Sequence, residues 1–388
     1  MKTLVMLLGG AVAAAALSAC SGASEKTAKL TESGLNPEKF IAEFRGDSTA
    51  LYTLRNANGM EVCVTNFGGR IVSLSVPDRD AKLRDVVLGF DSVQAYFPEN
   101  NLTDFGASIG RYANRINQGR FTLNDSTYQL PQNNFGHCLH GGTDMGTLGW
   151  QYRVYKAEQP SDTTVILTLE SADGDNGFPG NVKATVTYTL TADNAVDIAY
   201  SAVTDKPTII NMTNHSYFNL SGDPTKPVTG ELLWVNAEGF TPVDSTYMTL
   251  GTIEKVEGTP FDFRTPKIVG QDIAADNEQI RNGNGYDHNF VLESKGDINI
   301  PALKIEDPVS GIVMEMFTTE PGVQIYSGNF LDGTVTGKKG IKYAQRTGIC
   351  FESQHYPDSP NKPQWPSTVL NPGDTYHSRC IYRFSVAK

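Results

Sequence analysis

The chain has little cysteine, no excess of positive charge and no long amphipathic helical pattern, and each shortage excludes a class of protein. Five cysteines in 388 residues are too few for a disulfide framework. No Cys-x-x-Cys pair or regular histidine spacing indicates a metal site, so we expect neither a metal nor a cofactor. The 32 basic and 43 acidic residues give a net charge of -11, which disfavours nucleic acid as a partner. A neutral ligand fits this balance better.

The first segment has the features of an export signal. A positive start at residues 1–2 is followed by an uncharged apolar run over residues 4–17, which is too short to be a stable transmembrane anchor. The tetrad Leu17-Ser18-Ala19-Cys20 resembles the bacterial lipobox. An ordinary secretory signal with a chance cysteine is the alternative.

From these features we predict a lipoprotein-type signal peptide over residues 1–19 and a lipidated Cys20. Residues 20–45 would form a polar tether, because the segment after Cys20 is polar and poor in aromatic residues. The protein would then be exported and held by its lipid anchor in the bacterial cell envelope, in the periplasm or at the outer membrane. The sequence does not decide between these two locations.

The other four cysteines lie mostly in apolar, strand-like runs. They are Cys63, Cys138, Cys350 and Cys380. Their surroundings favour buried free thiols, although one bridge stays possible in an oxidising compartment.

Most of the chain beyond residue 46 is typical of short β-strands. Runs rich in β-branched residues occupy 61–65, 70–76, 163–169 and 182–190. Clusters of Gly, Asn, Asp and Pro separate such runs at short intervals. Short helical pieces are expected only near 92–97 and 270–275. This pattern predicts an all-β protein, a large antiparallel β-sandwich forming a single domain over residues 46–388.

One carboxylate stands where a strand-like run gives way to a loop rich in proline. Glu352 follows the apolar Cys350-Phe351 and precedes the loop 357–361. A glutamate in such a place is usually only solvated. Whether Glu352 has a function therefore has to be judged from the rest of the chain.

Several other strand-like segments carry more polar groups than their apolar setting requires. Together they supply amides, imidazoles, two carboxylates and an arginine, with aromatic neighbours. This inventory suits a site that recognises a ring of hydroxyl groups. The segments are 110–116, 137–142, 211–220, 285–291 and 321–326.

At these segments the sequence strongly resembles the aldose 1-epimerases, also called galactose mutarotases. The resemblance runs from about residue 51 to near the C-terminus, with the motifs in family order. The matching motifs are Gly110-Arg111-Tyr112-Ala113-Asn114-Arg115-Ile116, Leu139-His140-Gly141-Gly142, Asn214-His215-Ser216-Tyr217-Phe218-Asn219-Leu220, Thr259-Pro260-Phe261-Asp262-Phe263-Arg264, Tyr286-Asp287-His288-Asn289-Phe290, and Phe351-Glu352-Ser353-Gln354 continuing through Pro357-Asp358-Ser359-Pro360-Asn361.

The resemblance implies a β-sandwich of the galactose mutarotase type that interconverts the α and β anomers of free hexoses such as glucose and galactose. It implies Glu352 as the general base and His215 as the general acid. The implied sugar ligands are Asn114, Arg115, His140, Tyr217, Asp287 and Gln324.

Two other functions remain open at this point. A hexose 6-phosphate epimerase would need a basic pocket, for which the motifs offer only Arg111 and Arg115. A lipid-anchored sugar-binding protein without turnover would not need both proton-transfer residues. The preferred sugar and the oligomeric state are not determined by the sequence, although a monomer is expected.

Overall fold

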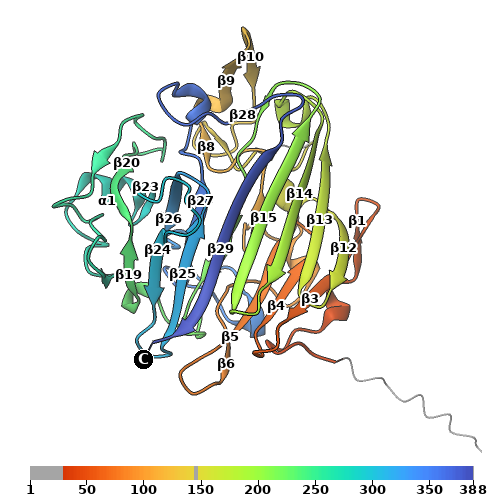
Figure 1. Ribbon diagram of the computed structural model, residues 1–388, viewed down its shortest axis with the longest axis vertical. Helices are drawn as coiled ribbons and strands as arrows, with labels where there is room; N and C mark the ends of the chain where they lie inside the picture. Colours follow the sequence, from red (N-terminus) through yellow and green to blue (C-terminus); the bar gives the residue numbers. More distant parts are fainter. Residues whose placement is uncertain (1–28, 144–146, 388) are drawn as a thin grey trace, which may run out of the picture.

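Three antiparallel sheets form the body of the protein. The computed structural model describes residues 29–143 and 147–387. The largest sheet crosses the whole molecule in Figure 1. In spatial order its strands are β12 (Lys156–Ser161), β13 (Thr164–Ser171), β14 (Val182–Leu190), β15 (Ala195–Thr204), β29 (Tyr376–Val386), β25 (Ile312–Thr318), β24 (Leu303–Glu306), β19 (Leu232–Val235) and β22 (Lys267–Ile268).

Two smaller sheets pack against this large one. The six-stranded sheet has the order β18 (Tyr217–Phe218), β27 (Ile349–Gln354), β26 (Gly322–Tyr326), β23 (Asp287–Leu292), β20 (Ala237–Thr241) and β21 (Glu254–Lys255). The four-stranded sheet has the order β3 (Leu51–Arg55), β4 (Glu61–Thr65), β5 (Arg70–Pro77) and β6 (Leu83–Asp85). One continuous hydrophobic core joins all three sheets, as in a sandwich.

The strand predictions are confirmed where side-chain alternation is strong. In β14, Val182, Ala184, Val186, Tyr188 and Leu190 are buried, and the residues between them are more exposed. Successive side chains of a strand point to opposite faces, so this period of two directs the apolar set into the core. The nine residues from 182 to 190 form the strand that was predicted.

One of the two predicted helical pieces is wrong. A 3-10 helix, η2 (Val93–Tyr96), lies within the predicted 92–97 segment. Residues 270–275 form bends and turns instead, in which the Ala275 N–H donates to the carbonyl of Asp272. The one α-helix of the described residues is α1 (Glu278–Gly283), whose N-cap Asn277 accepts hydrogen bonds from two backbone N–H groups.

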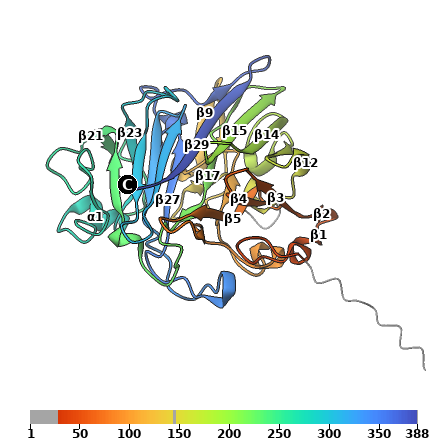
Figure 2. The same cartoon turned by 60° about the horizontal axis from the view of Figure 1, so that its bottom comes forward.

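The packed part of the chain begins before residue 46. Leu35 and Phe40 are buried, and the Phe44 ring packs edge-on against Phe67. The hydroxyl of Ser33 donates to that of Ser73 on β5 at 3.0 Å. Figure 2 shows β1 (Ala42–Phe44) and β2 (Asp47–Thr49) beside the four-stranded sheet. The packed domain therefore includes residues that the sequence analysis assigned to the tether.

All four cysteines that the structure describes are buried and free. This confirms the expectation of buried thiols at Cys63, Cys138, Cys350 and Cys380. The predicted signal peptide and Cys20 lie outside the described residues.

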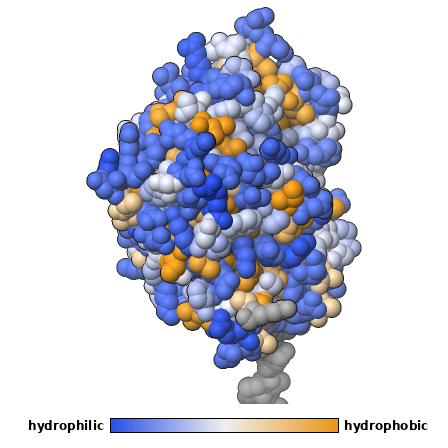
Figure 3. Space-filling view, turned by 60° about the vertical axis from the view of Figure 1, so that its left-hand side comes forward, coloured by the Kyte–Doolittle hydropathy of each residue, from blue (hydrophilic) through white to orange (hydrophobic). Residues whose placement is uncertain are grey.

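The face of the molecule shown in Figure 3 is mostly hydrophilic. Figure 3 shows apolar residues as separate groups among hydrophilic side chains on the face it presents. Single exposed apolar residues of this kind are ordinary in globular proteins.

Candidate active site

The six-stranded sheet presents one face of polar side chains. On its three central strands, Asp287, Gln324 and Glu352 point to the same side, with Gln324 directly opposite Glu352 across β26 and β27. The alternate residues, such as Phe290 and Phe351, belong to the hydrophobic core. The period-two pattern of these strands therefore separates a polar site from the core.

A second group of short strands places the other predicted residues beside this face. His215 ends β17 (Thr213–His215), which contacts β27. Arg115 begins β8 (Arg115–Ile116), which pairs with β11 (Cys138–Leu139). Directly after β11, the N–H of His140 donates to the carbonyl of Asn114, and the Asn114 N–H donates to His140 Nδ1 at 3.2 Å. Both of these residues adopt positive φ angles.

The centre of the site is a contact between Glu352 and His215. Nε2 of His215 lies 3.5 Å from Oε1 of Glu352. Both residues are buried, at 5% and 2% exposure, and Glu352 Oε2 has no hydrogen-bond partner within the protein. A buried carboxylate oxygen without a partner is free to accept a hydrogen bond from a ligand.

Burial moves the pKa values of these two groups in opposite directions. Burial raises the pKa of Glu352 well above its usual value, and the nearby charges of Asp287 and Asp104 raise it further. Burial lowers the pKa of His215, and the charge of Asp104 partly opposes this change. A carboxyl group and an imidazole this close together titrate as a coupled pair that can share one proton.

Arg115 and Asp287 are two further ionisable groups close enough to influence Glu352. The Arg115 guanidinium donates twice to Asn134 Oδ1, at 3.1 and 2.9 Å, and lies over the Tyr247 ring. Gln324 donates to Asp287 Oδ1 at 2.6 Å. Burial raises the pKa of Asp287, and the charge of Arg115 opposes that rise. These groups offer hydrogen bonds of both polarities to a ligand.

Aromatic rings complete the wall around His215. The Tyr217 ring stacks on the His215 ring at 5.1 Å, and His140 meets it edge-on at 5.2 Å. Tyr326 contacts both His215 and Tyr217. The structure thus brings together all eight residues that the sequence predicted for the site, Asn114 through its backbone contacts with His140.

Two residues of this site were missed by the sequence analysis as functional candidates. Cys350 Sγ lies 3.5 Å from His215 Nδ1, which leaves Nε2 facing Glu352. Asp104 lies with His140 and His215, and one ligand-type atom of each is within 4.8 Å of the others. No local pattern distinguishes Asp104, because its proximity to these histidines depends on strand pairing.

The group of Asp104, His140 and His215 has the chemistry of a zinc ligand set. In tetrahedral zinc sites with bonds of about 2.0–2.1 Å, ligand atoms are only about 3.4 Å apart. The ligand-type atoms of these three residues all lie within 4.8 Å of one another. His140 and His215 are among the residues that the family resemblance implies for the sugar site, so we interpret the three as acid–base and hydrogen-bonding groups of that site.

Arg111 does not reach the site. Its guanidinium is buried and donates to the carbonyl of Pro179 at 2.8 Å and to Ser171 Oγ at 2.7 Å. Arg111 therefore has a structural role. Of the two arginines considered for a phosphate group, only Arg115 lines the site.

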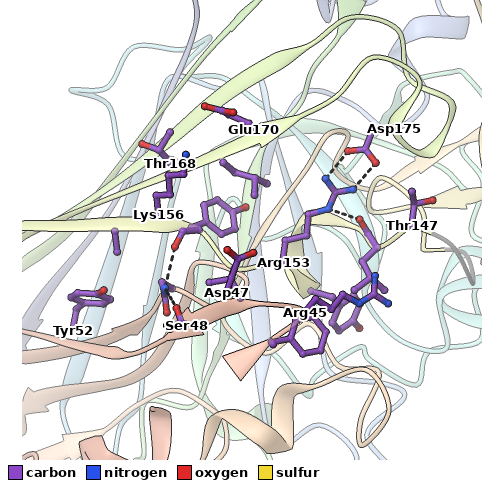
Figure 4. Close-up of a pocket in the computed structure, with 18 residues that line it drawn as sticks. Arg45, Asp47, Ser48, Tyr52, Thr147, Arg153, Lys156, Thr168, Glu170 and Asp175 are labelled. Atoms are coloured by element: carbon purple, nitrogen blue, oxygen red, sulfur yellow. Dashed lines mark hydrogen bonds and ion pairs between the residues drawn. The ribbon is translucent and has the colours of Figure 1, made fainter. Parts of the chain in front are cut away.

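A large cavity lies elsewhere in the molecule. It has a volume of about 760 Å³ and lies between β1–β2 and β12–β13 (Figure 4). The Arg153–Asp175 ion pair, with a distance of 2.6 Å, stands at one side of it. None of the residues lining it belongs to the site around Glu352.

Comparison with known proteins gives a consistent result over most of the chain. The family model described as Aldose 1-epimerase matches residues 50–383. The chain is 40% identical to the aldose 1-epimerase of Escherichia coli K12, over 87% of this chain and 96% of that protein. It is 39% identical to the galactose mutarotase of Mus musculus, over 88% of this chain and 96% of the mouse protein.

Solved structures show the same fold. An aldose epimerase homologue from C. elegans superposes with a TM-score of 0.80 at 30% identity, covering 88% of this chain and all of that one. The galactose 1-epimerase of Lactobacillus acidophilus gives a TM-score of 0.77 at 28% identity, covering 89% of this chain and 97% of that one.

Proposed function

The chain belongs to the aldose 1-epimerase family, and on this premise we propose that Glu352 and His215 carry the proton transfers of its reaction. The reaction is the interconversion of the α and β anomers of free hexoses such as glucose and galactose. The observation that carries the proposal is the 3.5 Å contact between His215 Nε2 and Glu352 Oε1 in a pocket of hydrogen-bonding groups.

Anomer exchange requires the hemiacetal ring to open and close again. Glu352 removes the proton from the C1 hydroxyl while His215 gives a proton to the ring oxygen, so the C1–O5 bond breaks and C1 becomes a carbonyl. Rotation about the C1–C2 bond then presents the other face of the carbonyl. On closure, His215 takes the proton back from the C5 hydroxyl and Glu352 returns its proton to the C1 oxygen.

Both groups must therefore work in both protonation states. A carboxylic acid normally loses its proton more readily than an imidazolium does. Burial raises the pKa of Glu352 and lowers that of His215, so each change opposes this usual difference. Each positioned group contributes about 100- to 10,000-fold to the rate.

The remaining predicted residues would hold the sugar in the correct position relative to Glu352 and His215. Arg115, His140 and Asp287 supply charged or hydrogen-bonding contacts to hydroxyl groups, together with Asn114 and Gln324. The faces of Tyr217 and Tyr326 suit the apolar face of a pyranose ring. Their effect is orientation, which fixes the C1 hydroxyl near Glu352.

Polarimetry on a soluble form that begins at residue 29 tests this function. Freshly dissolved α-glucose and α-galactose should reach anomeric equilibrium much faster with the protein than without it. Sugar binding without acceleration would instead indicate a sugar-binding protein. Acceleration confined to glucose 6-phosphate would indicate a phosphosugar epimerase.

We also propose that the protein is exported and anchored through a lipid on Cys20. The Leu17-Ser18-Ala19-Cys20 tetrad supports this proposal, and it lies outside the described residues. Within residues 29–143 and 147–387, no helix is long and apolar enough to cross a membrane. In bacteria fed radioactive palmitate, the wild-type protein should be labelled and the Cys20→Ser variant should not. Equal labelling of both would contradict the anchor.

A further inference from the structure

We propose that Asp104 is a positioning residue of the active site, whose carboxylate keeps a proton on the His215–Glu352 pair. This inference rests on the proposed function and adds a third ionisable group to it. Asp104 lies outside the motifs that carry the family resemblance. Its assignment comes from its place beside the two histidines.

The position of Asp104 follows from the strand that pairs with His215. Ala107 of β7 (Ala107–Ile109) is directly opposite His215 of β17. The Gly106 N–H donates to the His215 carbonyl at 3.0 Å, and the Ala107 N–H donates to the Asp104 carbonyl at 3.0 Å. Asp104 is therefore at the start of a tight turn that is hydrogen-bonded to the backbone of His215.

Other contacts fix this turn. Gly106 has a φ of +69°, and a Cβ atom there would lie 1.9 Å from the carbonyl oxygen of Ile71. The side chain of Asn214 donates to the Gly106 carbonyl at 2.9 Å. The buried guanidinium of Arg70 donates to the carbonyls of Thr103 and Phe105, at 3.1 and 2.9 Å. Asp104 thus lies between Thr103 and Phe105, whose carbonyl groups are both held by Arg70.

At least one oxygen of the Asp104 carboxylate makes no hydrogen bond within the protein. Asp104 Oδ1 is buried and has no hydrogen-bond partner within the protein. One carboxylate oxygen lies within 4.8 Å of a ring nitrogen of His140 and of His215. Its negative charge therefore lies close to both imidazole rings.

This charge acts on a site with several other ionisable groups. Arg70 opposes a positive charge on His215, and Asp104 is the largest contribution that favours one. Asp104 also disfavours the ionised form of Glu352. The groups that surround His215 from the neighbouring elements are Asp104, Arg70, His140, Tyr217, Tyr326, Cys350 and Glu352.

The consequence is a shift of both ionisations in the same direction. A negative charge stabilises the imidazolium of His215 and destabilises the carboxylate of Glu352, so it raises both pKa values. The catalytic pair needs one proton between its two members. Asp104 therefore moves the pH range in which the pair holds one proton upward.

The test is the pH dependence of kcat and kcat/KM, measured by polarimetry for the wild type, Asp104→Asn and Asp104→Glu. In Asp104→Asn, both limbs of the profile should move to lower pH by about one unit. Asp104→Glu keeps the charge and should keep the limbs near their wild-type positions. Asp374→Asn removes an equal charge from an exposed turn and serves as the control.

Three results would overturn the inference. If Asp104→Asn loses kcat equally at every pH and both limbs of the profile keep their positions, Asp104 has only a structural role. Displaced limbs in Asp104→Glu as well would mean that geometry, not charge, is responsible. Loss of activity on dialysis against EDTA that Zn²⁺ restores would make Asp104 a metal ligand. If the wild type fails to accelerate mutarotation, the proposed function fails instead.

An NMR titration tests the same inference without measuring activity, so it can be used even if a variant is poorly active. The NMR titration of the His215 ring should move to lower pH in Asp104→Asn and stay in place in Asp374→Asn. Should Asp104→Asn not fold, the titration of Asp104→Glu decides, because loss of the wild-type pH position despite the retained charge would refute the role.

Discussion

Oε1 of Glu352 lies 3.5 Å from Nε2 of His215, although the two residues come from different strands far apart in the chain. Glu352 is on β27 and His215 ends β17, and these strands contact each other (Figure 2). The contact joins the two groups that the family motifs imply for proton transfer. It also determines what each substitution should do.

Replacing Glu352 with glutamine should remove the base and keep the shape of the site. We expect Glu352→Gln to lower the mutarotation rate by at least about 100-fold, because an amide cannot accept the proton of the C1 hydroxyl. Galactose binding, measured by calorimetry, should change little. Glu254→Gln, on the exposed edge strand β21, is the matched control. A near-normal rate for Glu352→Gln would remove Glu352 from this role.

Replacing His215 with asparagine should slow ring opening and alter the pH profile. The Glu352 ionisation should stay visible, and the limb caused by His215 should disappear. Polarimetry between pH 5 and 9 checks this expectation. His377→Asn changes an exposed histidine and should leave the profile as it is. An unchanged pair of limbs in His215→Asn would assign the second ionisation to another group.

The thiol of Cys350 should support His215 without being reactive. Its Sγ lies 3.5 Å from His215 Nδ1, so Cys350→Ala should lower kcat by about fivefold, the equivalent of one weak hydrogen bond of about 1 kcal/mol. Cys350→Ser should retain more activity, because its hydroxyl can make the same contact. Equal losses in both variants would argue for packing rather than hydrogen bonding.

The four described cysteines should resist thiol reagents in the native protein. Burial raises the pKa of Cys63, Cys138 and Cys380 to about 12, and that of Cys350 is also well above its usual value. Thiols in this state form little of the reactive thiolate at neutral pH. A colorimetric disulfide reagent should therefore detect them only after unfolding. Rapid labelling of the native protein would show that at least one is accessible.

Glu231 should make the protein less stable as the pH rises from 4.5 to about 8. Burial raises its pKa from 4.5 to about 8, while Oε1 accepts a hydrogen bond from the Leu220 N–H. Between these two pH values the folded state holds a proton that the unfolded state has lost. The free energy of unfolding should therefore fall as pH rises, by up to about 1.4 kcal/mol per pH unit from this group.

The variant Glu231→Gln removes this ionisation and keeps the accepting oxygen. Its Tm should exceed that of the wild type by more at pH 8.5 than at pH 6. Thermal unfolding followed by circular dichroism gives both values, with Glu238→Gln as a surface control. The same Tm difference at both pH values would mean that Glu231 does not ionise on unfolding.

Local patterns were sufficient to predict many of the strands, and the family resemblance pointed to the candidate site residues. The alternation in residues 182–190 specifies which side chains enter the core, because the two faces of a strand are fixed by its geometry. The motifs also identified Glu352, His215 and their six companions. Residues 270–275 were misjudged, because propensity is a weak guide for so short a segment, which forms bends and turns in the folded chain.

The sequence by itself determined the class of fold and the residues to examine, since both depend on order and spacing along the chain. Only the tertiary structure decided which of them meet. It turned Arg111 inward to Ser171, packed Leu35 and Phe40 onto the domain, and placed Asp104 beside His215. These outcomes depend on register between distant strands, which no local pattern encodes, because each pairing is selected by the burial of the whole core.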